Sequence, residues 1–157
     1  MSVSPVVSNA SPIIALEQIG HLGLLHRLFS DLLIPSAVRR EISPAIVVPS
    51  WIVERRLSQP IGARILQASL GAGESEAITL ALELNARRVI LDDRAARRLA
   101  TALGLPVIGT LGVLLASKRK GFISSLRPSL DALVTSGFRI APSLYELVLT
   151  DAGEAST

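Results

Sequence analysis

The chain has 157 residues, of which about half are apolar and few are aromatic, and its formal net charge is +3. This length suffices for one domain whose core of Leu, Ile, Val and Ala needs no covalent staples. The chain has no cysteine, which excludes disulfides, thiolate zinc sites and cysteine nucleophiles. The first twelve residues lack the basic region of a signal peptide, so we expect a cytoplasmic protein.

Short apolar strands alternate with helices along the chain. Strands are expected at Val3–Val7, Leu32–Ile34, Arg88–Leu91 and Val107–Ile108. Helices are expected from Ser11 to Gly20, at Leu22–Phe29, from Pro35 to Ile42, and at Glu74–Asn85, Arg94–Leu103, Leu111–Lys120, Ile123–Ser136 and Pro142–Thr150. This order predicts an α/β fold, a three-layer sandwich with a central parallel sheet of four to five strands and helices on both faces. We expect a single domain over residues 1–150 and a disordered tail over residues 151–157.

Two stretches need separate comment. Ser43–Gln59 contains two prolines and the single tryptophan, and a loop with a short helix is expected there. Leu99–Ser117 carries no charge and is long enough to raise the question of a membrane span. Because glycines and a proline interrupt it, we predict a strand, a turn and a helix instead, with no membrane partner.

Oxygen-bearing side chains follow several of these strands. Asn9 follows the first strand, the pair Asp92-Asp93 follows the third, and Thr110 follows the fourth. Glutamates stand on the helices beside them, namely Glu41, Glu74 and Glu76. Since the working crevice of an open parallel sheet lies at the carboxyl ends of its strands, these side chains are expected to meet at one edge.

Such a set contains only oxygen ligands, which hard cations such as Mg²⁺ and Mn²⁺ prefer. A bound cation relieves the repulsion between carboxylates and assists phosphodiester hydrolysis. Each residue alone also has a structural explanation: Glu74 suits a helix N-terminus, Glu41 suits a solvated helix face, and one of Asp92 and Asp93 can cap the following helix. The functional interpretation therefore depends on their joint placement.

Other chemistries find less support. His21 and His26 are five residues apart, so they do not share a helix face as two zinc ligands would. The chain has no GxSxG motif for a serine nucleophile, and no GK[ST] follows Gly71-Ala72-Gly73 to form a phosphate loop. Arginines occur in adjacent pairs, which could hold a nucleic-acid backbone or simply be solvated.

Four segments together resemble the PIN-domain family. They are VVSNASPIIAL (Val6–Leu16), IPSAVRREI (Ile34–Ile42), GAGESEAITLALELNARRVILDDRAARRLA (Gly71–Ala100) and GLPVIGTLGVLL (Gly104–Leu115). The GExEA and LDDxxAR stretches are similar to a PIN subfamily related to VapC-type toxins. The resemblance extends from Val3 to about Leu149, and it is the combination of segments that is specific.

The resemblance implies a PIN-like sandwich and a Mg²⁺- or Mn²⁺-dependent ribonuclease, often a homodimeric toxin held by a small cognate antitoxin. Carried over by position, Asn9, Glu41 and Glu74 (or Glu76) match the first three acidic positions, and Asp92 or Asp93 matches the fourth. The expected metal ligands are Glu41, Glu74, Glu76, Asp92 and Asp93, with Ser11 and Thr110 in support. The expected contacts to the RNA backbone are Arg40, Arg94 and Arg97.

Asn9 departs from the family pattern, which has aspartate at that position. An amide oxygen can still bind a hard cation, but it brings no charge, so metal binding should be weaker or activity lost. Glu41, Glu74 and Asp92 or Asp93 could still hold one ion. The alternative is therefore a PIN fold of weakened or absent activity that binds protein or RNA. A receiver-like or phosphatase-like domain fits less well, because its acidic pair would follow the first strand.

Overall fold

The computed structural model of the protein describes residues 4–154 and contains one parallel sheet of five strands. The strands are β1 (Val6–Ser8), β2 (Leu32–Ile34), β3 (Ile52–Glu54), β4 (Arg88–Ile90) and β5 (Val107–Ile108). Their order across the sheet is β3-β2-β1-β4-β5, and every neighbouring pair is parallel. The parallel sheet predicted from the sequence is thus confirmed, with β1 at its centre.

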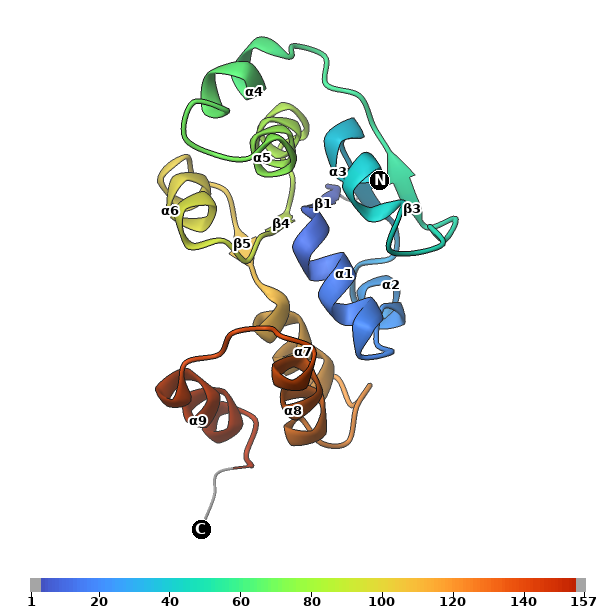
Figure 1. Ribbon diagram of the computed structural model, residues 1–157, viewed down its shortest axis with the longest axis vertical. Helices are drawn as coiled ribbons and strands as arrows, with labels where there is room; N and C mark the ends of the chain where they lie inside the picture. Colours follow the sequence, from blue (N-terminus) through green and yellow to red (C-terminus); the bar gives the residue numbers. More distant parts are fainter. Residues whose placement is uncertain (1–3, 155–157) are drawn as a thin grey trace.

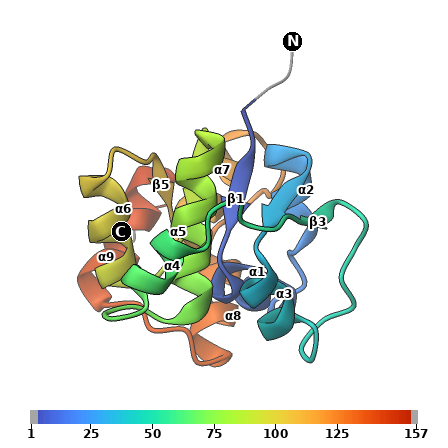
Figure 2. The same ribbon diagram turned by 90° about the horizontal axis from the view of Figure 1, so that it is seen from above.

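Helices cover both faces of the sheet. They are α1 (Ala10–Gln18), α2 (Gly23–Phe29), α3 (Ser36–Ile42), α4 (Ile61–Leu66), α5 (Ala72–Leu84), α6 (Arg94–Ala102), α7 (Thr110–Arg119), α8 (Arg127–Thr135) and α9 (Pro142–Asp151). In Figure 1, α4, α5 and α6 lie above the strands, whereas α1, α2, α7, α8 and α9 lie below them. Figure 2 looks onto the first of these layers, with α4 and α5 in front of the strands. The predicted three-layer α/β/α sandwich is confirmed.

The two faces of the sheet bury different residues because side chains alternate along a strand. Val6 of β1 belongs to the core under α1, α2 and α7, and its neighbour Val7 belongs to the core under α5 and α6. In β4, Ile90 faces the first of these cores and Val89 the second. Strands buried on both faces have continuous apolar sequences, which is why these short runs could be identified.

The strand β3 was not predicted. It lies at the edge of the sheet, and only Ile52 of its three residues is buried. An edge strand with one buried side chain leaves almost no apolar pattern in the sequence. The short helix expected within Ser43–Gln59 is absent, because this segment consists of turns, loop and β3, and the next helix, α4, begins after it at Ile61.

The uncharged stretch Leu99–Ser117 forms the end of α6, the short strand β5 and most of α7. This is the strand, turn and helix that its glycines and proline predicted. No helix within residues 4–154 has the length and apolar character needed to cross a membrane.

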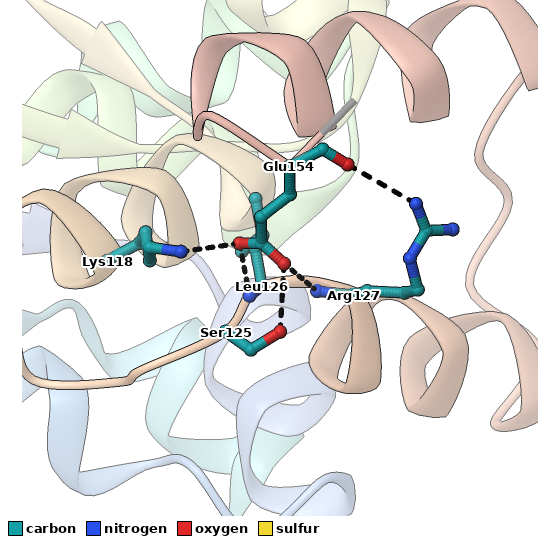
Figure 3. Close-up of polar contacts among 5 residues, drawn as sticks. All are labelled: Lys118, Ser125, Leu126, Arg127 and Glu154. Atoms are coloured by element: carbon teal, nitrogen blue, oxygen red, sulfur yellow. Dashed lines mark hydrogen bonds and ion pairs between the residues drawn. The ribbon is translucent and has the colours of Figure 1, made fainter. Parts of the chain in front are cut away.

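The end of the described chain is fastened to the start of α8 by Glu154 (Figure 3). Its carboxylate accepts hydrogen bonds from Nζ of Lys118 at 2.8 Å, Oγ of Ser125 at 2.8 Å and the backbone N–H of Leu126 at 2.7 Å. Residues 152–154 therefore have defined contacts, although they fall in the tail that was expected to be disordered, and residues 155–157 lie outside the described residues. Partial burial raises the pKa of Glu154, but these hydrogen bonds outweigh it and lower the pKa to about 2.

Glu154→Gln is expected to destabilise the protein at pH 7 by about 1–2 kcal/mol, since it removes a charged acceptor that lies partly in solvent. The pKa of Glu154 is lower in the folded state than its ordinary value of 4.5, so its stabilisation is complete above pH 4.5 and falls toward pH 2. Urea unfolding at pH 7 and pH 3 should show the wild type and Glu154→Gln converging. Glu146→Gln, on the exposed face of α9, is the control, and an equal loss in both variants would contradict the prediction.

Candidate active site at the carboxyl edge of the sheet

Three neighbouring strands deliver polar residues to one edge of the sheet. Asn9 directly follows β1, Asp92 comes two residues after β4, and Thr110 begins α7 after β5. The strand ends are tied together by backbone hydrogen bonds, from N–H of Asn9 to O of Ile90 at 3.0 Å and from N–H of Leu91 to O of Ile108 at 3.0 Å. The expectation that these residues reach one edge is met by the parallel pairing of β1, β4 and β5.

Asp92 is held by groups from the helices that follow both neighbouring strands. Its Oδ1 accepts the backbone N–H of Thr110 at 2.8 Å, and its Oδ2 accepts the hydroxyl of Thr110 at 2.6 Å. On the other side, Oγ of Ser11 lies 3.5 Å from the same Oδ2. Hydrogen bonds to both oxygens fix the orientation of the carboxylate. Thr110 thus contacts both oxygens of Asp92, and Ser11, which the resemblance matched to the hydroxyl beside the first acidic position, lies near Asp92 instead.

The adjacent carboxylate has a different role. The side chain of Asp93 accepts the backbone N–H of Ala96 at 2.9 Å and so caps the N-terminus of α6. The sequence left open which residue of the pair faces the sheet edge. The structure places Asp92 there and Asp93 at the helix cap.

Glu41 and Asn9 meet across Gly73, near the start of α5. A Cβ built on Gly73 would lie 2.5 Å from Oε1 of Glu41 and 3.0 Å from Oδ1 of Asn9. Every residue with a side chain would therefore push these two oxygens away. The absence of a side chain at Gly73 lets a carboxylate from α3 and an amide from the end of β1 approach the same point.

The amide oxygen of Asn9 has no partner. Asn9 is only 4% exposed, and its Oδ1 is the one buried side-chain nitrogen or oxygen within residues 4–154 that makes no hydrogen bond. Leaving a buried polar atom unsatisfied costs roughly 1–3 kcal/mol. A cation or a donor from a bound molecule would satisfy it.

The surroundings of Glu41 disfavour its negative charge. Partial burial raises the pKa of Glu41, and the negative charges of Glu74 and, to a smaller extent, Glu76 raise it further. The backbone N–H of Gly73 and the charge of Arg40 act in the opposite direction but do not cancel the effect. A carboxylate in this environment gains from a nearby positive charge.

Glu74 and Glu76 are both near Glu41 but differ in their contacts. Oε2 of Glu74 lies 3.3 Å from the backbone N of Gly71, the residue that directly precedes the helix of Glu74. Oε1 of Glu76 accepts the backbone N–H of Ala37 at 3.1 Å, which ties α5 to the start of α3. Glu76 is therefore engaged between helices, whereas Glu74 is the larger electrostatic influence on Glu41.

A model of the PIN-domain family matches residues 5–154, which is nearly the whole chain. The chain belongs to the PIN-domain family. Comparison with curated proteins and with solved structures gives no match. PIN domains are in general nucleases, which fits a hydrolase-type fold acting on nucleic acid, and they generally use divalent metals.

In this PIN domain the candidate metal ligands lack one negative charge, because Asn9 has an amide where the family has a carboxylate. No three His, Cys, Asp or Glu side chains in the described part of the chain are grouped so that they could hold a metal ion. The amide of Asn9, at the place expected for the first acidic residue, would have to complete any such set. Its unsatisfied oxygen beside the Glu41 carboxylate nevertheless fits a hard cation, because all the donors are oxygen.

Two glycines of the PIN domain were not identified as site residues from the sequence. Gly73 was considered only as part of Gly71-Ala72-Gly73, which lacks the sequence of a phosphate loop, although it is the point where Asn9 and Glu41 meet. A Cβ on Gly109 would lie 2.5 Å from Nη1 of Arg97 and 3.0 Å from Oδ1 of Asp92. Their motif context, GAGE and VIGT, was the available signal, but the need for close approach appears only in three dimensions.

The arginines expected to contact RNA lie around this edge. Nη1 of Arg97 donates to the backbone O of Leu91 at 3.0 Å, which positions its guanidinium near Asp92. Arg94 is exposed at the start of the same helix, and the charge of Arg40 acts on Glu41. Arg97 and Arg40 are thus close to acidic residues of the candidate site, and Arg94 lines the same cavity as Asp92.

Proposed function

We propose that this PIN domain is a metal-dependent endoribonuclease whose centre lies between Asn9, Glu41 and Asp92. One observation carries the proposal: the buried Oδ1 of Asn9 has no partner and lies beside the Glu41 carboxylate, with Gly73 leaving room for both. A structure rarely leaves a buried acceptor unsatisfied without a functional reason. Such a reason is a Mg²⁺ or Mn²⁺ ion shared by these oxygens.

The residues that would hold the cation are Asn9, Glu41 and Asp92, with Glu74 adding charge beside Glu41. When bound, a divalent cation lowers the pKa of water and stabilises the negative charge that develops on a phosphodiester. Glu74 fits this role better than Glu76, whose carboxylate is engaged by α3. Asp93 supplies the cap of α6 and is left out of the proposed centre.

The remaining side chains position the reacting groups. Ser11 and Thr110 hold the Asp92 carboxylate in one orientation. The guanidinium of Arg97, fixed by the backbone O of Leu91, and that of Arg94 can bind the phosphates on either side of the cleaved bond. Arginine suits this task because its donors form a fork that matches phosphate oxygens.

A second candidate function is a PIN fold that binds RNA or protein without cutting. Asn9 favours it, because the site lacks the carboxylate that the family has at this position. For the ribonuclease we further propose that the protein acts as a VapC-like toxin component in the cytoplasm, as a homodimer regulated by a small antitoxin protein. These partners rest on the sequence resemblance.

Asp92→Asn is expected to lower Mn²⁺-dependent RNA cleavage about a hundredfold, because it removes one of the proposed ligand charges while keeping the side chain's shape. Asp93→Asn is the matched control, since asparagine caps helices as well as aspartate, and it should keep cleavage within about threefold. The measurement is the initial rate of cleavage of a fluorescent single-stranded RNA with Mn²⁺, with Mg²⁺ and with EDTA.

Equal effects of the two substitutions would contradict the assignment of Asp92. Cleavage that persists in EDTA at the same rate would show that the cation has no role in the reaction. Absence of cleavage in the wild type, together with normal RNA binding, would favour the second candidate function.

A further inference from the structure

The side of the candidate active site around Gly73 has more negative than positive charge. Partial burial raises the pKa of Glu41, and the negative charges of Glu74 and Glu76 raise it further. The charge of Arg40 acts in the opposite direction but does not cancel this effect. Carboxylates gathered in this way are stabilised by a cation that comes from outside the chain. This side of the site therefore needs an added positive charge.

The opposite side of the site, around Gly109, already contains a positive charge. A Cβ built on Gly109 would lie 2.5 Å from Nη1 of Arg97 and 3.0 Å from Oδ1 of Asp92. Both atoms are thus close to the same point, and the guanidinium and the carboxylate are near neighbours. They can approach in this way because Gly109 has no side chain.

Arg97 is held in this place by the backbone at the sheet edge. Its Nη1 donates to the backbone O of Leu91 at 3.0 Å. Leu91 directly precedes Asp92 and is itself fixed, since its N–H donates to O of Ile108 at 3.0 Å. Arg97 is also partly buried, whereas its neighbour Arg98 is exposed. The guanidinium of Arg97 is therefore a fixed positive charge of the site.

The carboxylate of Asp92 lies between these two sides. Its Oδ1 is the oxygen near Gly109 and Arg97. Its Oδ2 lies 3.5 Å from Oγ of Ser11, in the first turn of α1, the helix that directly follows Asn9. One oxygen of Asp92 is thus next to a positive charge of the chain, and the other lies toward the side of Asn9.

We propose that the Arg97 guanidinium takes the place of a second metal ion, so that a single divalent cation, on the side of Asn9 and Glu41, completes the site. A second cation beside Oδ1 of Asp92 would be repelled by the guanidinium. Arg97 is in this respect a positioning residue, because it acts through Asp92. The inference rests on the proposed function and specifies how many metal ions the site takes. The contact exists without RNA, so it is tested on the protein alone.

The first measurement tests the contact between Arg97 and Asp92 without metal. Melting temperatures are recorded at low salt in EDTA for Arg97→Gln, Asp92→Asn and the double variant. Arg97→Gln should lower the melting temperature at least about 2 °C more in the wild type than in Asp92→Asn, where no carboxylate is left to neutralise. Arg97→Lys, which keeps the charge, should retain most of this difference. Arg98→Gln is the matched control, and its effect should be the same in both backgrounds.

The second measurement counts Mn²⁺ ions on the RNA-free protein, by electron paramagnetic resonance of the unbound ion. Only ions that Glu41→Gln displaces are counted as bound in the site, and the wild type should bind one per chain. Arg97→Gln should bind this ion at least about threefold more tightly, because a like charge near it is removed. Arg98→Gln should change the affinity less than about twofold, since exposed charges are screened by solvent and salt.

The inference would be overturned by any of three results. They are an equal effect of Arg97→Gln in both backgrounds, two Mn²⁺ ions displaced from the wild type by Glu41→Gln, and an unchanged Mn²⁺ affinity in Arg97→Gln. The nuclease proposal fails separately. If the melting and binding results are as expected but neither the wild type nor Asn9→Asp cleaves RNA with Mn²⁺, the single-ion assignment stands without it. A wild type that binds no Mn²⁺ would overturn both.

Discussion

Asn9→Asp is expected to raise Mn²⁺-dependent RNA cleavage at least about tenfold. The substitution adds a negative charge beside the Glu41 carboxylate, where the unsatisfied Oδ1 of Asn9 now lies. The attraction between the added negative charge and a positive unit charge about 4 Å away is about 4 kcal/mol at the effective dielectric constant near a protein surface. Desolvation of the new carboxylate cancels a part of this attraction. The remainder should appear as tighter Mn²⁺ binding and as faster cleavage at limiting Mn²⁺.

The same substitution has an opposite effect without metal. A second carboxylate at a 4% exposed position, next to Glu41, whose own pKa is already raised, should lower the melting temperature in EDTA. Mn²⁺ should restore it, and the rise on adding Mn²⁺ should be larger for Asn9→Asp than for the wild type. Asn85→Asp is a control outside the site, at the C-terminus of α5, which should show no such difference in the rise caused by Mn²⁺.

The outcome separates the two candidate functions. An active wild type that Asn9→Asp improves supports a ribonuclease with weakened metal binding. A silent wild type that Asn9→Asp activates supports the non-cutting PIN fold. If Asn9→Asp changes neither Mn²⁺ binding nor cleavage, the first acidic position has no part in metal binding here.

Gly73→Ala is expected to lower cleavage about a hundredfold and leave the fold intact. The new Cβ would lie 2.5 Å from Oε1 of Glu41 and 3.0 Å from Oδ1 of Asn9, so both oxygens must move. The Glu41 side chain is exposed enough to swing away. Alanine also favours a helix over glycine by about 1 kcal/mol, so the free energy of unfolding should change little. Initial rates and urea unfolding of the same preparation measure the two effects.

Gly62→Ala is the matched control for Gly73→Ala. It lies in α4, and its new Cβ would meet Cγ2 of Thr79 at 3.5 Å, an ordinary contact distance. It should therefore keep full activity. Full activity in Gly73→Ala as well would show that Glu41 and Asn9 do not act from the positions seen in the structure.

The fold could be predicted because the central strands are buried on both sides. Val6–Ser8, Leu32–Ile34 and Arg88–Ile90 leave short apolar runs between helices, and this alternation defines a parallel sheet. The edge strand β3 could not be found, since Val53 and Glu54 are exposed. A strand can be predicted from the sequence when its burial gives it a continuous apolar pattern.

The candidate site could be predicted only as a set of residues at one edge. Asp92 and Asp93 follow the same strand, and nothing in their sequence shows that one turns to Thr110 and the other to Ala96. The role of Gly73 depends on two side chains from distant segments. The place of Arg97 beside Asp92 likewise depends on Gly109, which comes from another segment.

The proposed function requires that Asn9 and Glu41 share a divalent cation. Crystals soaked in MnCl₂, with diffraction data collected at the manganese absorption edge, test it directly. We expect an anomalous peak in contact with both Oδ1 of Asn9 and the carboxylate of Glu41. A saturating soak that gives no peak there, or one only at remote carboxylates such as Asp131 or Glu146, would contradict it.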